Sequence, residues 1–335
     1  MTDDRCGPLQ FDYEVETWPL VTAFRISGHL WECAEVVRVR LRWNEHIGQG
    51  EAAGVYYRND TVASMMDALR SVRAAIEAGV SRRSLYELLP AGGARNALDC
   101  ALWDLQSKVS GQSVWRLAGL EQPQPLITTL ACGADSPDMM ARVASGYTHA
   151  KAIKLKLTGE PIDAERVRAV REVRPNVWLG VDGNQGFTRG FLESLMPVLV
   201  AERVDLIEQP FPVGEESLLD VFRTPIPIAA DESVQSLADL EAHAGRFAVV
   251  NIKLDKCGGL TAGLEMARAA RSLGFDVMVG CMMGTSLSMA PAFLLGQLCK
   301  VVDLDAPTFL RSDRATPVTY HDGYIQCPTS LWGYP

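Results

Sequence analysis

Eight short apolar runs, separated by amphipathic segments, occupy the chain from residue 126 to residue 305. Such alternation is typical of parallel strands joined by helices, and eight repeats are the number that closes a barrel. A short loop follows the eighth run, so the pattern predicts an α/β fold, a (β/α)7β TIM-like barrel. The predicted strands are LITTLA (126–131), AIKLKL (152–157), VWLGVD (177–182), DLIEQP (205–210), PIPIAADE (225–232), VVNIKLDK (249–256), DVMVGCM (276–282) and KVVDLD (300–305).

The segments on either side of the barrel predict a second part of the molecule. Residues 1–60 alternate like strands, as in EVVRVRLRW, and residues 61–120 change to helical periodicity. We expect an α+β capping domain over 1–122 and the barrel catalytic domain over 123–305, with prolines in the linker. The C-terminal tail, 306–335, is expected to pack back on the capping domain.

Charge and composition restrict the partners. The net charge is −9 and the pI is about 5.2, which argues against nucleic acid or an anionic membrane, because both require a basic face. No apolar stretch reaches membrane-spanning length, and MTDDRCGPLQ lacks the apolar core of a signal peptide. The eight cysteines are scattered without paired spacing, so we expect reduced thiols in a cytoplasmic protein.

Three acidic residues follow the ends of three consecutive runs. Asp182, Glu208 and Asp231 are separated by 26 and 23 residues, about the length of one strand and one helix with their loops. The carboxyl ends of barrel strands meet at one mouth, so these side chains are expected to converge. Three carboxylates without histidine or thiolate suit a hard cation such as Mg²⁺. The alternative is that each one caps a helix or pairs with a basic side chain.

Lysines lie on the strands before and after these carboxylates. Lys154 and Lys156 are two residues apart, so both face the same side of their strand. Lys253 follows the run VVNI and is expected to point into the mouth, while Lys256, three residues later, faces away. Two lysines close together depress each other's pKa, which makes a lysine usable as a base near neutral pH. The alternative, a solvated edge strand, fits poorly in a barrel of apolar strands.

Two further carboxylates, Asp303 and Asp305, end the eighth run. They share one face of the strand beside the predicted mouth, where they would bind a cationic group such as a free ammonium. A helix cap or a surface turn is the alternative for an acidic pair of this spacing. The chain has no G-x-S-x-G elbow, no phosphate loop and no G-x-G-x-x-G after a strand, so those chemistries find no support.

Several motifs resemble the enolase superfamily, in its muconate-lactonizing-enzyme subgroup. The barrel motifs are KLK, DGNQGF, IEQPF, ADES, NIKLDKCGG and VGCMMGTS. ETWPL with FRIS, and GEAAGVYYR, resemble the two capping loops of that family, and ARNALDCALWDLQSK resembles the helix before its barrel. The resemblance covers nearly the whole chain and is strongest to the dipeptide epimerases, whose members include enzymes acting on Ala-Glu.

The resemblance implies a 1,1-proton transfer, an epimerisation at the α-carbon of the C-terminal residue of a dipeptide through an enediolate. Lys156 and Lys253 would remove and return the α-proton on opposite faces, and Lys154 would help to hold the enolate charge. A bound metal would act as a Lewis acid on the substrate carboxylate. The implied ligands of one Mg²⁺ per subunit are Asp182, Glu208 and Asp231.

The resemblance also bears on the substrate. In dipeptide epimerases a D-x-D at the eighth strand binds the substrate ammonium, which implies this role for Asp303 and Asp305. Epimerases acting on Ala-Glu carry an arginine in the first capping loop, where this chain has Trp31. With Met283 and Gly284 in the same pocket, we expect an apolar or bulky C-terminal side chain rather than glutamate. Homo-oligomeric assembly is expected, as for many barrel enzymes of this kind.

Two alternatives stay open. The same lysines would serve an N-acylamino-acid racemase, a succinylbenzoate synthase or a cycloisomerase of the superfamily. A non-catalytic binding protein on the same fold is the alternative from another class. The intact set of carboxylates and lysines argues against it, because a relic should have lost some of them.

Overall fold

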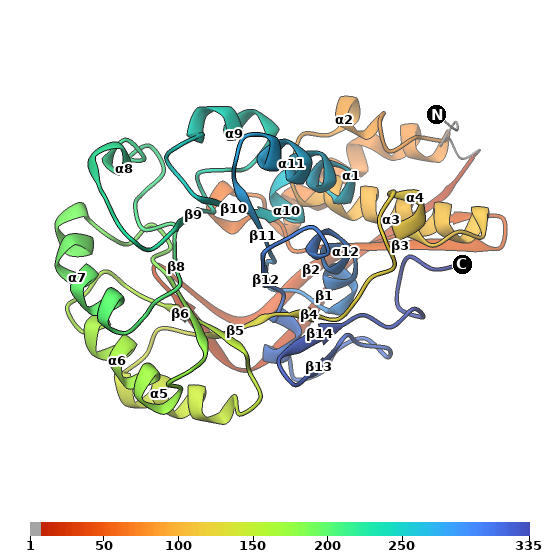
Figure 1. The fold of residues 1–335 in the computed structure, drawn as a ribbon. Coiled ribbons are helices and arrows are strands. Elements are labelled where there is room, and N and C mark those ends of the chain that lie inside the picture. Colours follow the sequence, from red (N-terminus) through yellow and green to blue (C-terminus); the bar gives the residue numbers. More distant parts are fainter. Residues whose placement is uncertain (1–7) are drawn as a thin grey trace.

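The computed structural model describes residues 8–335, and its centre is a barrel of parallel strands (Figure 1). Eight strands form one sheet in the order β12-β11-β10-β9-β8-β7-β6-β5, which is sequence order. The predicted (β/α)7β barrel is therefore confirmed. The strands are β5 Thr129–Cys132, β6 Ala152–Lys156, β7 Trp178–Asp182, β8 Leu206–Glu208, β9 Ile228–Ala230, β10 Val249–Lys253, β11 Asp276–Gly280 and β12 Val301–Asp303.

Helices connect the strands and lie outside them (Figure 1). None of the described helices is both long and apolar enough to cross a membrane. The last strand is followed by a single 3-10 turn, η2 (Ala306–Phe309). The helices are α5 Pro137–Gly146, α6 Asp163–Val173, α7 Arg189–Ala201, α8 Leu218–Val221, α9 Leu237–His243, α10 Leu254–Cys257, α11 Leu260–Ser272 and α12 Ser286–Gly296.

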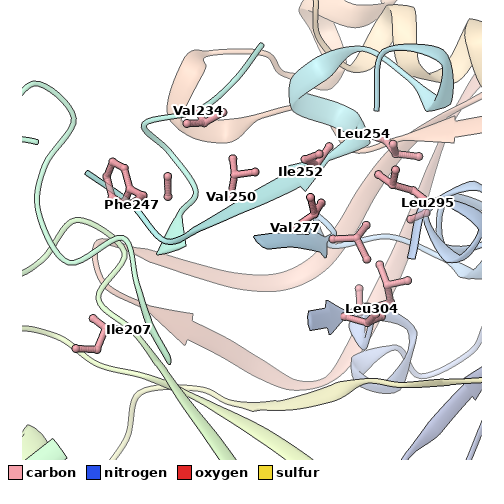
Figure 2. Packing of buried hydrophobic residues seen from close by; sticks show 14 of the residues in the cluster. Ile207, Val234, Phe247, Val250, Ile252, Leu254, Val277, Leu295 and Leu304 are labelled. Atoms are coloured by element: carbon pink, nitrogen blue, oxygen red, sulfur yellow. The ribbon is translucent and has the colours of Figure 1, made fainter. Parts of the chain in front are cut away.

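Apolar side chains from strands and helices form one continuous core in the barrel. Figure 2 shows part of it, where Val250 and Ile252 of β10 and Val277 of β11 lie near Leu254 and Leu295 from the helices. All five side chains are buried. Consecutive residues of a strand face opposite sides. Because Val250 and Ile252 face the outer core, Asn251 and Lys253 face the barrel interior.

The capping domain has a three-stranded antiparallel sheet and a helical layer with its own apolar core. Its third strand lies within residues 1–60, the segment expected to form strands, and contains two glycines that interrupt the apolar pattern. Those glycines let helix α3 pack directly on the strand. The elements are β1 Gln10–Ile26, β2 His29–Trp43, β3 His46–Ala52, η1 Tyr56–Arg58, α1 Val62–Glu77, α2 Leu85–Leu88, α3 Gly93–Ser110 and α4 Val114–Leu117.

The tail joins both parts of the molecule. Strands β13 (Thr319–His321) and β14 (Tyr324–Gln326) form a small sheet with β4 (Leu126–Ile127). The predicted first barrel strand, LITTLA, is thus divided, and only its second half begins β5. Elsewhere the tail reaches the capping domain, where the indole Nε1 of Trp332 donates to the backbone oxygen of Gln49 at 2.9 Å.

The close packing of β3 on α3 makes a stability prediction. A Cβ added to Gly50 would lie 2.1 Å from the backbone oxygen of Ala97. Because backbone cannot move away cheaply, we expect Gly50→Ala to lower the free energy of unfolding by about 3 kcal/mol. Gly190→Ala is the control, since an added Cβ on α7 meets no atom within 4 Å outside its own helix. It should leave stability equal or slightly higher. Urea denaturation measures both, and equal losses would contradict the prediction.

Candidate active site

The predicted site residues meet at the mouth formed by the carboxyl ends of the strands. A cavity of about 70 Å³ lies there, between the barrel and the capping domain. Asp182 and Glu208 lie just outside its lining and contact its lysines. The predicted residues that line it are Trp31, Lys154, Lys156, Asp231, Lys253, Met283, Asp303 and Asp305.

Strand register explains why the groups converge. In the parallel ladders, Lys156 lies beside Asp182, and Asp182 lies beside Glu208. Asp231 follows β9, the next strand of the sheet. Each of the three carboxylates is at most 1% exposed. Three neighbouring strands thus end in buried carboxylates at the same level of the barrel.

Each lysine is paired with a carboxylate. Lys156 Nζ lies 2.6 Å from Asp182 Oδ2, and Lys253 Nζ lies 2.7 Å from Asp231 Oδ2. Lys154 Nζ donates to Glu208 Oε2 at 2.9 Å and also to Asp303 Oδ2. Lys154 therefore connects a predicted metal ligand to the predicted ammonium site.

For Lys154 and Lys253, these ion pairs act against the expected depression of the lysine pKa. Burial alone lowers the pKa of Lys154, but the charges of Asp303, Glu208 and Asp182 outweigh burial and raise this pKa well above its ordinary value. The pKa of Lys253 is raised in the same way, chiefly by Asp231. Repulsion between lysines would lower these pKa values, but the attraction of the neighbouring carboxylates is the larger effect in this arrangement.

Lys256 was predicted to face away from the site, but its side chain points toward it. Strand β10 ends at Lys253, and the chain turns at once into α10, so the alternation of a strand no longer applies. The Lys256 side chain returns to the mouth, where Nζ donates to Asp231 Oδ1 at 2.7 Å and to the backbone oxygen of Asn251 at 2.9 Å. Lys256 thus holds one oxygen of Asp231, while Lys253 faces the other.

Three more residues of the site were missed in the sequence. Asn251 Nδ2 donates to Glu208 Oε1 at 2.7 Å and fixes that carboxylate. Its position two residues before Lys253 on one strand was an available signal. Asn184 and Glu232 line the cavity and contact each other at 3.4 Å. Each lies one or two residues after a predicted metal ligand, in the motifs DGN and ADE. The sequence alone did not distinguish these two residues from ordinary turn residues.

The donor set fits a divalent cation by its charge. Six buried carboxylates face four buried lysines, which leaves two negative charges if all are ionised. Repulsion is visible in the acids: burial and Asp182 raise the pKa of Glu208 to about 7, and burial and Asp231 raise the pKa of Glu232 to about 8. A divalent cation would relieve this repulsion. The carboxylates are Asp182, Glu208, Asp231, Glu232, Asp303 and Asp305, and the lysines are Lys154, Lys156, Lys253 and Lys256.

Oxygen atoms without hydrogen-bond donors support the same fit. Among the described residues, Glu232 Oε2 and Asn184 Oδ1 are buried and accept no hydrogen bond. Asp231 Oδ2 is also buried, and its partner is the ammonium of Lys253 at 2.7 Å. Within residues 8–335 no three acidic, histidine or cysteine side chains are arranged to hold a metal as they stand. The carboxylates point toward the lysines instead. A bound cation would therefore have to replace the lysines as the partner of these carboxylates.

The carboxylates of the eighth strand are oriented by the strand beside them. Asp303 accepts from the hydroxyl of Thr129 as well as from Lys154. Asp305 Oδ2 accepts from the backbone N–H of Ala131 at 2.6 Å. Burial and the charge of Asp303 raise the pKa of Asp305 to about 7. A cationic group bound here would favour the ionised form of both acids.

Aromatic side chains of the capping domain cover the cavity. Trp31 lies edge-on to Tyr56, with ring centroids 5.1 Å apart, and Phe24 packs on Phe309 of η2 at 4.6 Å. Phe24, Trp31, Tyr56 and Phe309 all line the cavity, together with Met283. This part of the site has no charged group of the kind that would recognise a substrate carboxylate.

Gly284 lies outside the lining of the cavity, although it was predicted to belong to the pocket. The next residue, Thr285, caps the N-terminus of α12 and donates from its backbone N–H to the buried Glu51 of β3 at 2.8 Å. This contact draws Gly284 toward the capping domain. A Cβ at Gly284 would lie 2.6 Å from Ser288 Oγ, so the small residue serves packing.

Two family models match most of the chain. One is the mandelate racemase / muconate lactonizing enzyme N-terminal domain, over residues 13–119, and the other is described as enolase C-terminal domain-like, over residues 138–333. Fold and site therefore define a member of the enolase superfamily. The chain belongs to the mandelate racemase and muconate lactonizing enzyme family within it.

Among curated relatives, the L-Ala-D/L-Glu epimerase of Escherichia coli K12 is 40% identical over 312 residues, which cover 92% of this chain and 97% of that protein. A hydrophobic dipeptide epimerase of Roseobacter litoralis is 32% identical over 326 residues, covering 92% and 93%. Both relatives match nearly end to end.

Solved structures give the same result. An enolase family member from Agrobacterium tumefaciens with homology to dipeptide epimerases, bound to sodium and L-Ala-L-Glu, has a TM-score of 0.94 at 35% identity, covering 97% of this chain and all of that one. A dipeptide epimerase from Methylococcus capsulatus, complexed with Mg and L-Arg-D-Lys, has a TM-score of 0.89 at 29% identity, covering 96% and 97%.

The charge balance of the site predicts a response to metal. Mg²⁺ that binds only the folded protein should stabilise it by about 2.7 kcal/mol when its free concentration is 100 times its Kd. Glu208→Gln removes one predicted ligand charge and should abolish most of this gain. Glu193→Gln, whose carboxylate is half exposed on α7, is the matched control and should keep it. Thermal denaturation with and without Mg²⁺ measures the effect; an equal gain in both variants would contradict the assignment.

Proposed function

We propose that this protein is a Mg²⁺-dependent dipeptide epimerase that inverts the α-carbon of the C-terminal residue. One observation carries the proposal. Lys156 on β6 and Lys253 on β10 line the same cavity, although their strands are four positions apart in an eight-stranded barrel. Strands four apart lie on opposite sides of such a barrel. A substrate held between them would present one face of its α-carbon to each lysine.

Two lysines on opposite faces are the arrangement that inversion requires. The lysine that takes the α-proton must be neutral, so its ion pair with Asp182 or Asp231 has to open first. The electron pair of the C–H bond then moves into the substrate carboxylate to give an enediolate. The other lysine, as an ammonium, returns a proton to the opposite face. When bound by Asp182, Glu208 and Asp231, one Mg²⁺ per subunit would supply Lewis-acid stabilisation of the negative charge.

The remaining charged groups suit a dipeptide. Asp303 and Asp305 are buried carboxylates at the mouth, and together they would bind the free ammonium of the N-terminal residue. Lys154 lies between Asp303 and Glu208 and would share the charge of the enediolate. Substrates without an ammonium would leave the two acids close together with only Lys154 as a cationic partner at this end of the cavity. The ammonium of a dipeptide therefore supplies the charge that this end needs.

The aromatic cover favours an apolar side chain on the C-terminal residue. Trp31, Tyr56 and Met283 present rings and a thioether to the cavity, and burial of apolar surface against them stabilises an apolar side chain. A glutamate side chain would have to lose water there without gaining a cationic partner. Cytoplasmic location and homo-oligomeric assembly remain predictions.

Proton exchange with solvent tests the reaction. Purified protein with Mg²⁺ in D₂O should add one deuterium to particular L,L-dipeptides, detected by mass spectrometry as a gain of about one dalton. Lys156→Ala and Lys253→Ala should each lower epimerisation by about 10²–10⁴-fold, because each lacks one acid–base group. Each variant should still exchange the proton of one epimer, on the face that keeps its lysine.

Lys300→Ala, at an exposed lysine, is the control for this experiment and should retain wild-type exchange. No deuterium gain with any dipeptide would overturn the proposed function. Undiminished epimerisation in both lysine variants would overturn the assignment of the two bases.

A substitution at Trp31 tests the side-chain preference. Trp31→Arg puts a cation where the cover is now aromatic, so it should shift kcat/KM from Leu-ended toward Glu-ended dipeptides by about tenfold or more. Trp31→Phe keeps an apolar ring and should preserve the wild-type preference. The measurement is kcat/KM for L-Ala-L-Leu and L-Ala-L-Glu with each variant. An unchanged ratio in Trp31→Arg would show that this residue does not select the side chain.

A further inference from the structure

The barrel has a seam between its first and last strands. β5 and β12 stand at the two ends of the hydrogen-bonded sheet order, so no strand ladder joins them. Side chains bridge them instead. The Thr128 hydroxyl accepts from the backbone N–H of Leu304 at 3.0 Å and donates to the backbone oxygen of Val302. Thr128 therefore ties the two strands together through backbone groups alone.

The acids of the eighth strand take part in the same seam. The Thr129 hydroxyl donates to Asp303 Oδ1, and the Ala131 N–H donates to Asp305 Oδ2 at 2.6 Å. Thr129 is 1% exposed, so water does not compete for its hydroxyl. The side chains that would bind the substrate ammonium are thus oriented from β5, across the seam, rather than from their own strand.

Asp303 is held between two opposed partners. Thr129 holds Oδ1 from one side, and Lys154 holds Oδ2 from the other. A carboxylate bound only by Lys154 would be free to turn both oxygens to that cation, since an ion pair is less directional than two fixed hydrogen bonds. The hydroxyl of Thr129 therefore fixes the plane in which Asp303 faces the cavity.

We propose that Thr129 is a positioning residue for the substrate ammonium: its hydroxyl orients Asp303 so that Asp303 and Asp305 together receive the ammonium of a dipeptide. This inference rests on the proposed function. Thr129 acts through Asp303 and does not carry the proton, so its loss should weaken binding of the ammonium group and affect the chemical step little.

Paired ligands separate this role from a structural one. The first probe is L-Ala-L-Leu, and the second is (S)-lactoyl-L-leucine, in which a hydroxyl replaces the ammonium. Thr129→Val removes the hydroxyl at nearly constant volume. It should raise the Kd and KM for L-Ala-L-Leu about tenfold, the size of one charge-linked hydrogen bond, with kcat within about threefold. The Kd for (S)-lactoyl-L-leucine should change less than about twofold. Isothermal titration calorimetry with Mg²⁺ present gives both values of Kd.

Two further variants complete the test. Thr129→Ser keeps the hydroxyl and should restore the wild-type Kd for L-Ala-L-Leu to within about twofold. Thr128→Val breaks the seam contacts to backbone without touching either carboxylate, so it should lower thermal stability but keep the ratio of the two Kd values.

The outcomes distinguish this inference from the function on which it rests. Deuterium exchange in the wild type, together with equal losses for both probes in Thr129→Val, would overturn the positioning role alone. If Thr128→Val and Thr129→Val changed the ratio of the two Kd values equally, the positioning role would also be overturned. A loosened seam would then explain both changes. Absence of exchange with every dipeptide in the wild type would overturn the proposed function and this inference together.

Discussion

The site depends on a network of buried charges that compensate one another. A lysine as deeply buried as Lys154, at 2% exposure, is costly unless carboxylates surround it. Lys154 meets this condition by bridging Glu208 and Asp303, and it thereby connects the proposed metal end of the cavity to the proposed ammonium end. The acids are in excess, which raises the pKa of Glu208 and Glu232 and prepares the site for added positive charge. In the proposed function, a divalent cation would offset the two excess negative charges, and a dipeptide would bring an ammonium and a carboxylate that cancel each other.

The capping domain completes this network by excluding water. Its aromatic residues Trp31 and Tyr56 lie over the lysines and acids, and interactions between charges strengthen when water is excluded. An ion pair outside the site joins the tail to the capping sheet: Arg314 of the tail lies 2.6 Å from the buried Glu51 of β3, and Glu51 also accepts from Thr285 at the start of α12. The tail therefore connects the capping sheet to the barrel at the edge of the site.

Regular patterns in the chain predicted most of the architecture and the main charged groups. Asp182, Glu208 and Asp231 could be placed because each follows a strand, and strand ends in a parallel barrel share one mouth. Strand β3 lies in the segment expected to form strands, but the role of Gly48 and Gly50 is visible only where α3 packs on them. Lys256 was misplaced because the strand ends three residues earlier, and local alternation cannot show where a strand stops.

The sequence by itself determined the barrel and most of the acids and lysines at its mouth, because these follow from periodicity and residue type, and the family resemblance pointed to Trp31 in the capping loop. Only the tertiary structure decided which charges are partners and which side chains orient them. Asn251 on Glu208, Lys256 on Asp231 and Thr129 on Asp303 are contacts between separate elements whose relative height is set by register and barrel closure. Register depends on packing across the whole barrel, so distances of a few ångströms between distant residues are not encoded in any local pattern.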